Sequence, residues 1–202
     1  MKTGITGGIG SGKSYVCRLL AAHGIQVYDC DAAAKRLIRT SPDIRQQLTA
    51  LIGPDTYTYP ESPESPESLE NPKNPIPLPI LNKAAVTRFL LESEDHAKAI
   101  DRIVHPAVFR DFEESGMEWM ESAILYESGI YRLVDRVVVV TAPDEVRIRR
   151  VMQRDGISRE TVQKWMQRQW SQEEVCRRAD YEIVNDGIAD LEAQIRHLLT
   201  TK

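Results

Sequence analysis

One stretch near the start of the chain combines glycines with a lysine and a serine at a spacing suited to holding phosphate groups. Residues 7–14 read GGIGSGKS and fit the pattern G-x-x-x-x-G-K-[ST] without a mismatch. Glycines let backbone N–H groups turn inward around phosphates, and the first turn of a following helix adds partial positive charge. Lys13 is placed to reach the β- and γ-phosphates of a nucleotide, and the Ser14 hydroxyl is placed to ligate Mg²⁺. The predicted contacts to ATP are Gly8, Ile9, Gly10, Ser11, Gly12, Lys13, Ser14 and Tyr15.

The residues on either side supply the strand and the helix that such a loop requires. Residues 2–6 are compatible with a short strand, and residues 14–23 place apolar side chains at helical spacing before Gly24, a typical helix-ending residue. Residues 25–28 favour a second strand, so the order strand, helix, strand predicts a parallel sheet. A glycine turn that only joins a strand to a helix would not need the lysine and the serine as well.

Two aspartates, Asp29 and Asp31, follow the second predicted strand. Because ligands of open α/β sheets lie at the carboxyl ends of the strands, one of these carboxylates can face the γ-phosphate of bound ATP. A base in that position accepts a proton from an attacking hydroxyl and contributes roughly 10²–10⁴-fold in rate. The alternative is that Asp31 only caps the helix that begins at Ala32.

A cluster of arginines in the second half of the chain suits the same chemistry. It consists of Arg147, Arg149, Arg150 and Arg154, of which the first, third and fourth share one face of a predicted helix. The transition state of phosphoryl transfer is highly charged and is stabilised by cations. We therefore expect residues 144–177 to form a lid that closes over ATP and excludes water, whereas the alternative is an ordinary solvated basic face.

Other classes of phosphate-binding protein fit the sequence less well. A GTPase would carry an NKxD-like segment late in the chain, and no such segment is found. A motor-type ATPase would end a hydrophobic strand directly in Asp-Glu, but in RVVVVTAPDE three residues separate the strand from the two acids. These observations favour a kinase that acts on a small molecule.

The segment from Gly53 to Pro79 differs in composition from the rest of the chain. It contains eight of the eleven prolines and a repeated Glu-Ser-Pro triplet. Proline forbids regular helix, so an extended surface loop is expected, and a docking peptide for a partner is the alternative.

The remaining patterns predict alternating helices and strands. A break is expected at His105-Pro106, because the residue before a proline avoids the helical region. Helices are predicted at 31–39, 42–52, 82–91, 95–104, 106–117, 158–170 and 191–199, and strands at 122–126, 136–141 and 181–184. The predicted fold class is α/β, a three-layer parallel sheet of the P-loop nucleotide-kinase type in one domain, 1–202. We divide it into a core (1–30, 118–143 and 178–202), a helical acceptor-side region (31–117 with loop 53–79) and the lid (144–177).

Composition restricts the partners and the compartment. The net charge is −4, which does not favour a nucleic-acid partner. The three cysteines form no CxxC pair, the N-terminus has no secretory pattern, and the longest apolar run is too short to span a bilayer. We expect a cytoplasmic protein, monomeric by preference, with no membrane or nucleic-acid partner.

Over nearly its whole length the chain resembles the dephospho-coenzyme A kinase family. The motifs that carry the resemblance are the opening Thr6 to Ser14, Asp29-Cys30-Asp31, Ile103-Val104-His105-Pro106, Ile124-Leu125-Tyr126-Glu127, Arg150 to Asp155 followed by Gln169, Ala179-Asp180 and Asn185-Asp186-Gly187. The resemblance implies that ATP phosphorylates the 3′-hydroxyl of dephospho-CoA and yields ADP and coenzyme A, the last step of CoA biosynthesis.

The resemblance also implies roles for individual residues. Lys13 is implied to be catalytic and to hold ATP, and Ser14 to hold ATP and Mg²⁺. Asp31 becomes the base and Arg150 a catalytic contact to phosphate. The other implied contacts are Arg154 and Asn185 for ATP, and Asp31, His105, Pro106 and Glu127 for the acceptor. A kinase for another nucleotide or nucleoside, and a nucleotide-binding regulatory module, remain the alternative functions.

Overall fold

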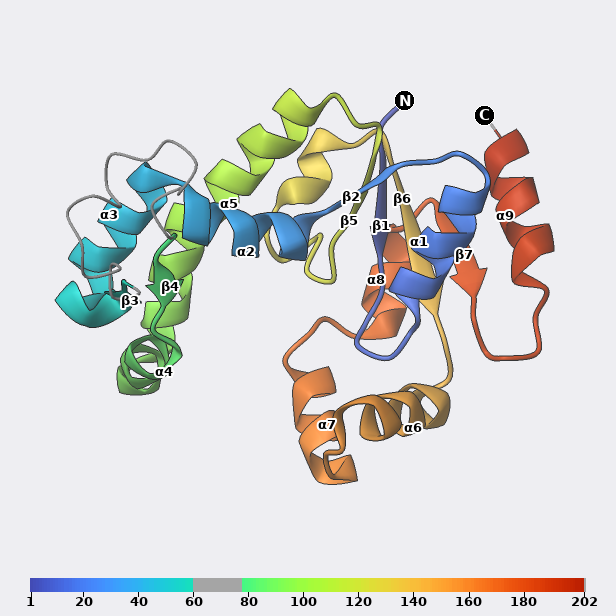
Figure 1. Cartoon of the computed structure of the whole chain (residues 1–202). Helices are drawn as coiled ribbons and strands as arrows, with labels where there is room; N and C mark the ends of the chain where they lie inside the picture. Colours follow the sequence, from blue (N-terminus) through green and yellow to red (C-terminus); the bar gives the residue numbers. More distant parts are fainter. Residues whose placement is uncertain (60–77, 202) are drawn as a thin grey trace, which may run out of the picture. The chain divides into compact units, whose positions relative to one another are not determined.

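The computed structural model describes residues 1–59 and 78–201 of the 202-residue chain (Figure 1). Its centre is a sheet of five parallel strands in the order β2–β5–β1–β6–β7. The strands are β1 (Thr3–Thr6), β2 (Val27–Asp29), β5 (Trp119–Glu121), β6 (Arg136–Thr141) and β7 (Tyr181–Val184). The predicted parallel α/β sheet is confirmed, and β1, which leads into the glycine-rich loop, is its middle strand.

Two helices cover one face of the sheet and form its main core. Helix α1 (Lys13–Ala22) places Val16 and Leu20 one turn apart, and both side chains are fully buried. They pack with β-strand residues and with α9 (Leu191–Thr200) in a cluster of Ile5, Val16, Leu20, Trp119, Val138, Val140, Ile183, Ile195 and Leu198. This cluster fixes the helix that follows the loop relative to the strand that precedes it.

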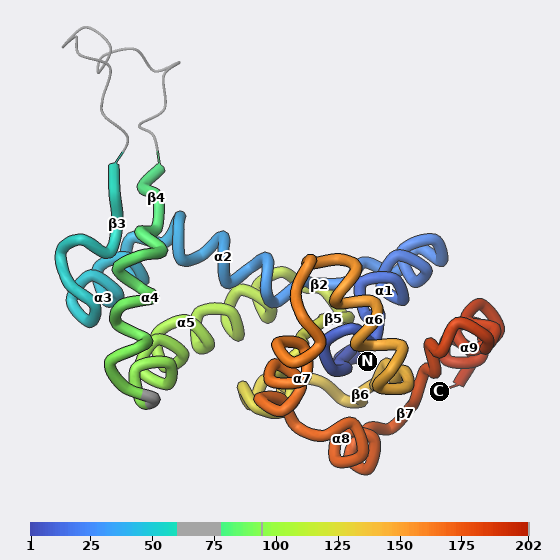
Figure 2. Tube along the Cα trace, turned by 90° about the horizontal axis from the view of Figure 1, so that it is seen from below, coloured from blue at the N-terminus to red at the C-terminus, as the bar shows by residue number. Residues whose placement is uncertain are grey.

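The opposite face of β1 is packed so closely that it requires a glycine. A Cβ atom on Gly4 would lie 2.7 Å from Cδ1 of Leu125 and 3.3 Å from Cγ2 of Val134. The turn helix η3 (Ile130–Leu133) lies between those two residues in the sequence, and α8 (Gln172–Arg178) packs beside β6. Figure 2 shows α1 and α8 on opposite sides of the strands.

The chain divides into two compact units, of which Met1–Cys30 with Phe112–Lys202 is the first and Asp31–Asp111 the second. The first also contains α6 (Asp144–Asp155) and α7 (Arg159–Gln167), which pack side by side. The second contains α2 (Cys30–Thr40, apart from its first residue), α3 (Pro42–Ile52), η1 (Pro54–Thr56), β3 (Tyr57–Thr58), β4 (Ile80–Leu81), α4 (Lys83–Glu92) and most of α5 (Glu94–Ser115). Its core is built on Ile44, Leu48, Tyr57 and Ala107.

The predicted helix break at His105-Pro106 is wrong. Helix α5 runs without interruption from Glu94 to Ser115 and carries Pro106 inside it. A proline inside a helix removes one hydrogen bond and costs about 3 kcal/mol. Packing on both sides offsets this cost, because Ile103 and Ala107 join the same hydrophobic cluster of the second unit. Tertiary burial therefore overrides the local preference.

The strand predicted at 122–126 is also wrong. The strand of this region is β5, which ends at Glu121, and the residues after it form successive turns. Ser122 starts the turns, because its hydroxyl accepts a hydrogen bond from the Ile124 N–H at 3.3 Å. Of the apolar residues that suggested a strand, Leu125 and Tyr126 are buried, whereas Ala123 and Ile124 are exposed.

The other differences are smaller. The second strand begins two residues later than predicted, and α8 was not predicted. Strand β3, near the start of the segment 53–79, pairs antiparallel with β4, which follows that segment (Figure 2). The Glu-Ser-Pro repeat lies outside the described residues. Across residues 1–59 and 78–201, the structure contains no helix both long and apolar enough to cross a membrane.

Replacing Tyr57 tests the core of the second unit. Its buried hydroxyl donates to the Ile38 carbonyl at 2.9 Å, so Tyr57→Phe should lower the free energy of unfolding by about 1 kcal/mol in a urea titration. Tyr59→Phe, at a position 69% exposed, is the control and should change nothing.

The same residue predicts an alkaline transition. Burial raises the pKa of Tyr57 from 10.0 to about 12, so the folded state favours the neutral phenol. This contribution is complete below pH 10 and is lost as the pH rises toward about 12. Wild-type protein should lose stability over that interval relative to Tyr57→Phe, and an identical pH dependence of the two would contradict the assignment.

Candidate functional site

The glycine-rich loop is held in a shape that only glycines allow. Gly10 and Gly12 have φ angles of 79° and 94°, in the left-handed region. A Cβ atom on Gly12 would lie 2.1 Å from Nδ2 of Asn185, and one on Gly10 would lie 2.6 Å from the Arg147 carbonyl oxygen. The loop therefore packs directly on its neighbours through its backbone, and α1 begins at Lys13 immediately after it.

Lys13 lies folded back onto this loop. Its Nζ donates to the Gly7 carbonyl at 2.7 Å and lies 3.8 Å from Oε1 of Glu121, the last residue of β5. The side chain is 11% exposed, and burial lowers the pKa of Lys13, an effect that Glu121 partly opposes. The result is a nearly buried ammonium group with a carboxylate beside it.

Asn185 and Arg150 hold the loop by hydrogen bonds at Ser11. Asn185 follows β7 and is buried, and its Nδ2 donates to the Ser11 carbonyl at 2.8 Å. Arg150 of α6 donates through Nη1 to the Asn185 carbonyl at 3.0 Å and through Nη2 to its side-chain oxygen at 3.3 Å. The loop is thereby tied both to the end of the sheet and to α6.

A cavity of about 520 Å³ opens beside the loop. Its lining is rich in cationic and hydroxyl groups and comprises Ile9, Gly10, Gly12, Lys13, Ser14, Tyr15, Arg18, Ala123, Arg150, Val151, Arg154 and Gln169. Arg154 is an exposed cation of this lining, with a side chain 63% exposed and two hydrogen bonds to Asp155 at 2.7 and 2.8 Å. A cavity with this lining can hold a polyanion.

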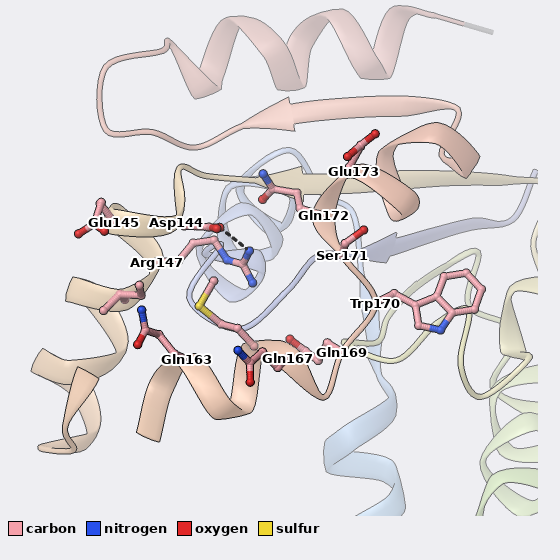
Figure 3. Close-up of a pocket in the computed structure, with 12 residues that line it drawn as sticks. Asp144, Glu145, Arg147, Gln163, Gln167, Gln169, Trp170, Ser171, Gln172 and Glu173 are labelled. Atoms are coloured by element: carbon pink, nitrogen blue, oxygen red, sulfur yellow. Dashed lines mark hydrogen bonds and ion pairs between the residues drawn. The ribbon is translucent and has the colours of Figure 1, made fainter. Parts of the chain in front are cut away.

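A larger cavity of about 920 Å³ lies elsewhere in the first unit (Figure 3). It is lined by residues of α6, α7 and the segment leading into α8, including the acids Asp144, Glu145 and Glu173. Lys13 and Ser14 do not line it. Because three carboxylates would repel a polyphosphate, we take the smaller cavity at the loop as the candidate nucleotide site.

The structure therefore brings most of the predicted nucleotide-binding residues together. Ile9, Gly10, Gly12, Lys13, Ser14, Tyr15, Arg150 and Arg154 line one cavity, and Asn185 contacts the carbonyl of Ser11 beneath it. The Ser11 hydroxyl itself is buried and finds no hydrogen-bond partner among the described residues. Gly8 lies against Arg147, because a Cβ atom there would be 2.2 Å from Nη2 of that arginine.

The residues predicted for the acceptor are placed differently. Glu127 is exposed, does not line the cavity at the loop, and accepts a hydrogen bond from the Trp170 N–H at 3.2 Å. Asp31 belongs to the second unit, where it lies exposed in the first turn of α2 and pairs with Lys35. His105 lies on α5 with Nε2 3.5 Å from Asp101, and Pro106 is the next residue of that helix.

Three residues of this region make contacts that were not predicted from the sequence, although Arg147 was counted in the arginine cluster and Gln169 among the family motifs. Glu121 was missed because the strand before it was predicted three residues too late; its position at the end of a strand would have drawn attention to it. Arg147 and Gln169 contact Ile9 of the loop, from positions 138 and 160 residues away. Neither spacing leaves a local signal in the sequence.

The donor atoms at the loop fit a magnesium ion that is shared with a nucleotide. Within residues 1–59 and 78–201, no group of three or more His, Cys, Asp or Glu side chains is arranged to hold a metal ion. The Ser14 hydroxyl lines the loop cavity. Mg²⁺ prefers oxygen ligands, keeps several waters and binds through substrate phosphates rather than in a protein cage.

The chain is similar to known kinases over nearly its full length. The family model described as dephospho-CoA kinase matches residues 1–59 and 79–190. A dephospho-CoA kinase from Bacteroides fragilis is 37% identical over 98% of this chain and 91% of the relative, and one from Chlorobaculum tepidum is 34% identical over 96% and 91%.

Solved structures show the same fold. The crystal structure of TT1252 from Thermus thermophilus matches with a TM-score of 0.77 and 29% identity, over 100% of this chain and 98% of that chain. The dephospho-CoA kinase from Campylobacter jejuni matches with a TM-score of 0.60 and 18% identity, over 98% and 96%. At that identity the second likeness concerns the fold alone.

The contact between Gly12 and Asn185 predicts a selective loss of binding. In Gly12→Ala the added methyl group would displace the Asn185 amide, and we expect ATP affinity, measured by calorimetric titration, to fall about 100-fold. Gly24→Ala is the matched control, because Gly24 also has a positive φ of 82° but no atom within 4 Å of the added Cβ.

Both substitutions should cost similar backbone strain, about 1 kcal/mol each. Equal ATP affinities for the two variants would show that the packing at Gly12 does not serve nucleotide binding.

Proposed function

The chain belongs to the dephospho-CoA kinase family, and from this premise we propose that it transfers the γ-phosphoryl group of ATP to the 3′-hydroxyl of dephospho-CoA. The products are ADP and coenzyme A, so the reaction is the last step of CoA biosynthesis. The observation that carries the proposal is the cavity at the glycine-rich loop, where Lys13, Ser14, Arg150 and Arg154 converge in a chain that matches the family over residues 1–59 and 79–190.

The loop is proposed to hold the phosphates of ATP through its backbone N–H groups. Three features support this: the left-handed glycines, the start of α1 at the loop, and the nearly buried ammonium group of Lys13. Phosphate oxygens would compete with the Gly7 carbonyl for the Lys13 ammonium group. Their negative charge would stabilise the charged form of Lys13, which burial disfavours. Asn185 contacts the loop at Ser11, and residues 185–187 are proposed to border the adenosine.

Mg²⁺ is proposed to bind at the Ser14 hydroxyl together with the phosphates of ATP. When bound, such an ion would neutralise the negative charge that develops on the phosphate oxygens in the transition state. Ser14 follows Lys13 in the first turn of α1, so its hydroxyl and the ammonium group are presented to the same cavity.

Phosphoryl transfer requires a base and cations in addition to the loop. The 3′-hydroxyl oxygen forms a bond to the γ-phosphorus while the bond from that phosphorus to the bridging oxygen of ADP breaks, and Asp31 is proposed to accept the hydroxyl proton. Arg150 and Arg154 are proposed to stabilise the charge on the transferred group. Arg154 suits this role because its side chain is open to the cavity and bound only to Asp155.

His105, Pro106 and Glu127 are the proposed contacts to the acceptor, together with Asp31 as the proposed base. The protein is proposed to act in the cytoplasm as a monomer and to need no nucleic-acid or membrane partner, on the basis of its net charge of −4 and of a sequence without a CxxC pair.

The direct test combines purified protein, Mg-ATP and dephospho-CoA and measures ADP and the mass of the acceptor together. The proposal predicts one phosphate gained by dephospho-CoA for each ADP released. ADP without a phosphorylated acceptor, or transfer to nucleoside monophosphates in preference to dephospho-CoA, would contradict it.

Replacing the proposed base separates chemistry from folding. Asp31→Asn removes the proton acceptor, so kcat should fall roughly 10²–10⁴-fold. Because the side chain is 76% exposed, the free energy of unfolding should change by less than about 1 kcal/mol. Asp43→Asn, at another exposed first-turn aspartate, is the control and should leave kcat unchanged. A wild-type kcat in Asp31→Asn would exclude Asp31 as the base.

A further inference from the structure

Ile9, near the tip of the glycine-rich loop, is held in three ways by the segment 144–177. Its side chain packs against the hydrophobic cluster of Ile148, Val151 and Val162, which joins α6 to α7. Its N–H donates to Oε1 of Gln169 at 2.8 Å, and its carbonyl accepts from Nε of Arg147 at 3.0 Å. Both polar groups of one residue and its side chain are thus bound by residues far away in the sequence.

Arg147 is buried to an extent that is unusual for an arginine, with a side chain 6% exposed. Its Nη1 donates to Asp144 at 3.1 Å, the pair shown dashed in Figure 3, and burial lowers the pKa of the guanidinium. Its Nη2 lies against Gly8, and its backbone carbonyl lies against Gly10. Burying this charge costs free energy. In addition to its pair with Asp144, Arg147 contacts Ile9 and the residues on either side of Ile9.

Gln169 is fixed from the opposite direction by the residue that follows it. The Trp170 N–H donates to Glu127 at 3.2 Å, and the Trp170 ring stacks on Tyr126 with ring centres 5.8 Å apart and planes 3° from parallel. The Arg178 guanidinium lies over the same ring at 4.6 Å. Because Trp170 is bound to the turns after β5, the backbone position of Gln169 is restricted. Its side-chain amide oxygen therefore holds the Ile9 N–H in a defined place.

We propose that Arg147 and Gln169 are positioning residues for phosphoryl transfer. They fix the two peptide groups that flank Ile9, and with them the neighbouring amides that are proposed to bind phosphate. The inference rests on the proposed function and deepens it. Displacements of about 1 Å in such a site cost about 10²-fold in rate, so a loop built of glycines needs an external constraint of this kind. In this account Glu127 contributes through Trp170 and Gln169 to the geometry of the loop.

The test uses substitutions that keep side-chain length but remove one hydrogen bond. Gln169→Met removes the acceptor for the Ile9 N–H, and Arg147→Met removes the donor to its carbonyl. Gln163→Met on α7, the helix that precedes Gln169, and Arg149→Met on α6, the helix that carries Arg147, are the controls at exposed positions. Gln169→Glu keeps an acceptor oxygen and serves as the conservative rescue.

The first readout is hydrogen–deuterium exchange of the Ile9 amide in the protein without nucleotide, which does not depend on the proposed reaction. Gln169→Met should accelerate this exchange about 10-fold, the loss of a hydrogen bond worth about 1.4 kcal/mol, and Gln169→Glu should restore the protection. The two controls should exchange at the wild-type rate. Unchanged exchange in folded Gln169→Met would overturn the inference.

The second readout is steady-state kinetics with ATP and dephospho-CoA. Gln169→Met and Arg147→Met should each lower kcat/KM for ATP by about 10–100-fold, with KM for the acceptor changed less than about 2-fold. Because the two side chains hold the two peptide groups that flank Ile9, the double variant should lose less than the product of the two single losses. Additive losses, or equal losses for both substrates, would contradict a positioning role.

The two readouts separate the inference from the function it rests on. If wild-type protein did not phosphorylate dephospho-CoA, the proposed function would fail, while the exchange experiment would still decide whether Gln169 fixes Ile9. If Arg147→Met does not fold, Gln169→Met carries the test alone, since Gln169 is only partly buried.

Discussion

The close approach of Gly12 to the Asn185 amide is the constraint on which the rest of the site depends. A methyl group at Gly12 would lie 2.1 Å from Asn185 Nδ2, so the loop can take its place only as bare backbone. The same amide donates to the Ser11 carbonyl and is itself held by Arg150. The ends of β1 and β7, the start of α1 and one face of α6 therefore meet around one short segment, and the side chains of Asn185 and Arg150 join them by hydrogen bonds.

The loop is in contact with two largely buried cations even without a ligand. Lys13 and Arg147 are both largely buried, and burial lowers the pKa of each, while Glu121 and Asp144 partly offset the effect. A buried cation with one carboxylate nearby gains further stabilisation from a phosphate, since the added negative charge compensates for lost hydration. The chain as a whole carries a net charge of −4, so the preference for anions is local to the loop and its cavity.

The parts of the molecule that follow from short-range patterns could be predicted from the sequence. GGIGSGKS between a strand and an amphipathic helix identified the loop, and RVVVVT identified β6, because both depend only on neighbouring residues. The helix predicted at 82–91 was found for the same reason, since Asn82 caps α4 by accepting from the Ala84 and Ala85 N–H groups.

The failures arose where distant residues decide the structure. Pro106 was read as a helix break, but packing of Ile103 and Ala107 into the core of the second unit keeps α5 continuous. The apolar residues after Ser122 resembled a strand, whereas a side-chain hydrogen bond from Ile124 N–H to Ser122 starts turns there. The contacts of Ile9 with Arg147 and Gln169 span 138 and 160 residues and depend on the packing of α6 and α7.

The central claim is that the backbone of residues 7–14 receives the phosphates of ATP. The most direct measurement labels the glycines with ¹⁵N and follows their amide resonances by NMR during a titration with Mg-ATP. The account predicts large shifts for Gly8, Gly10 and Gly12 at saturation and none for Gly24 and Gly116, which share the positive φ of Gly10 and Gly12 but have open space around them. Saturable binding that leaves the loop glycines unshifted and moves other resonances would contradict it.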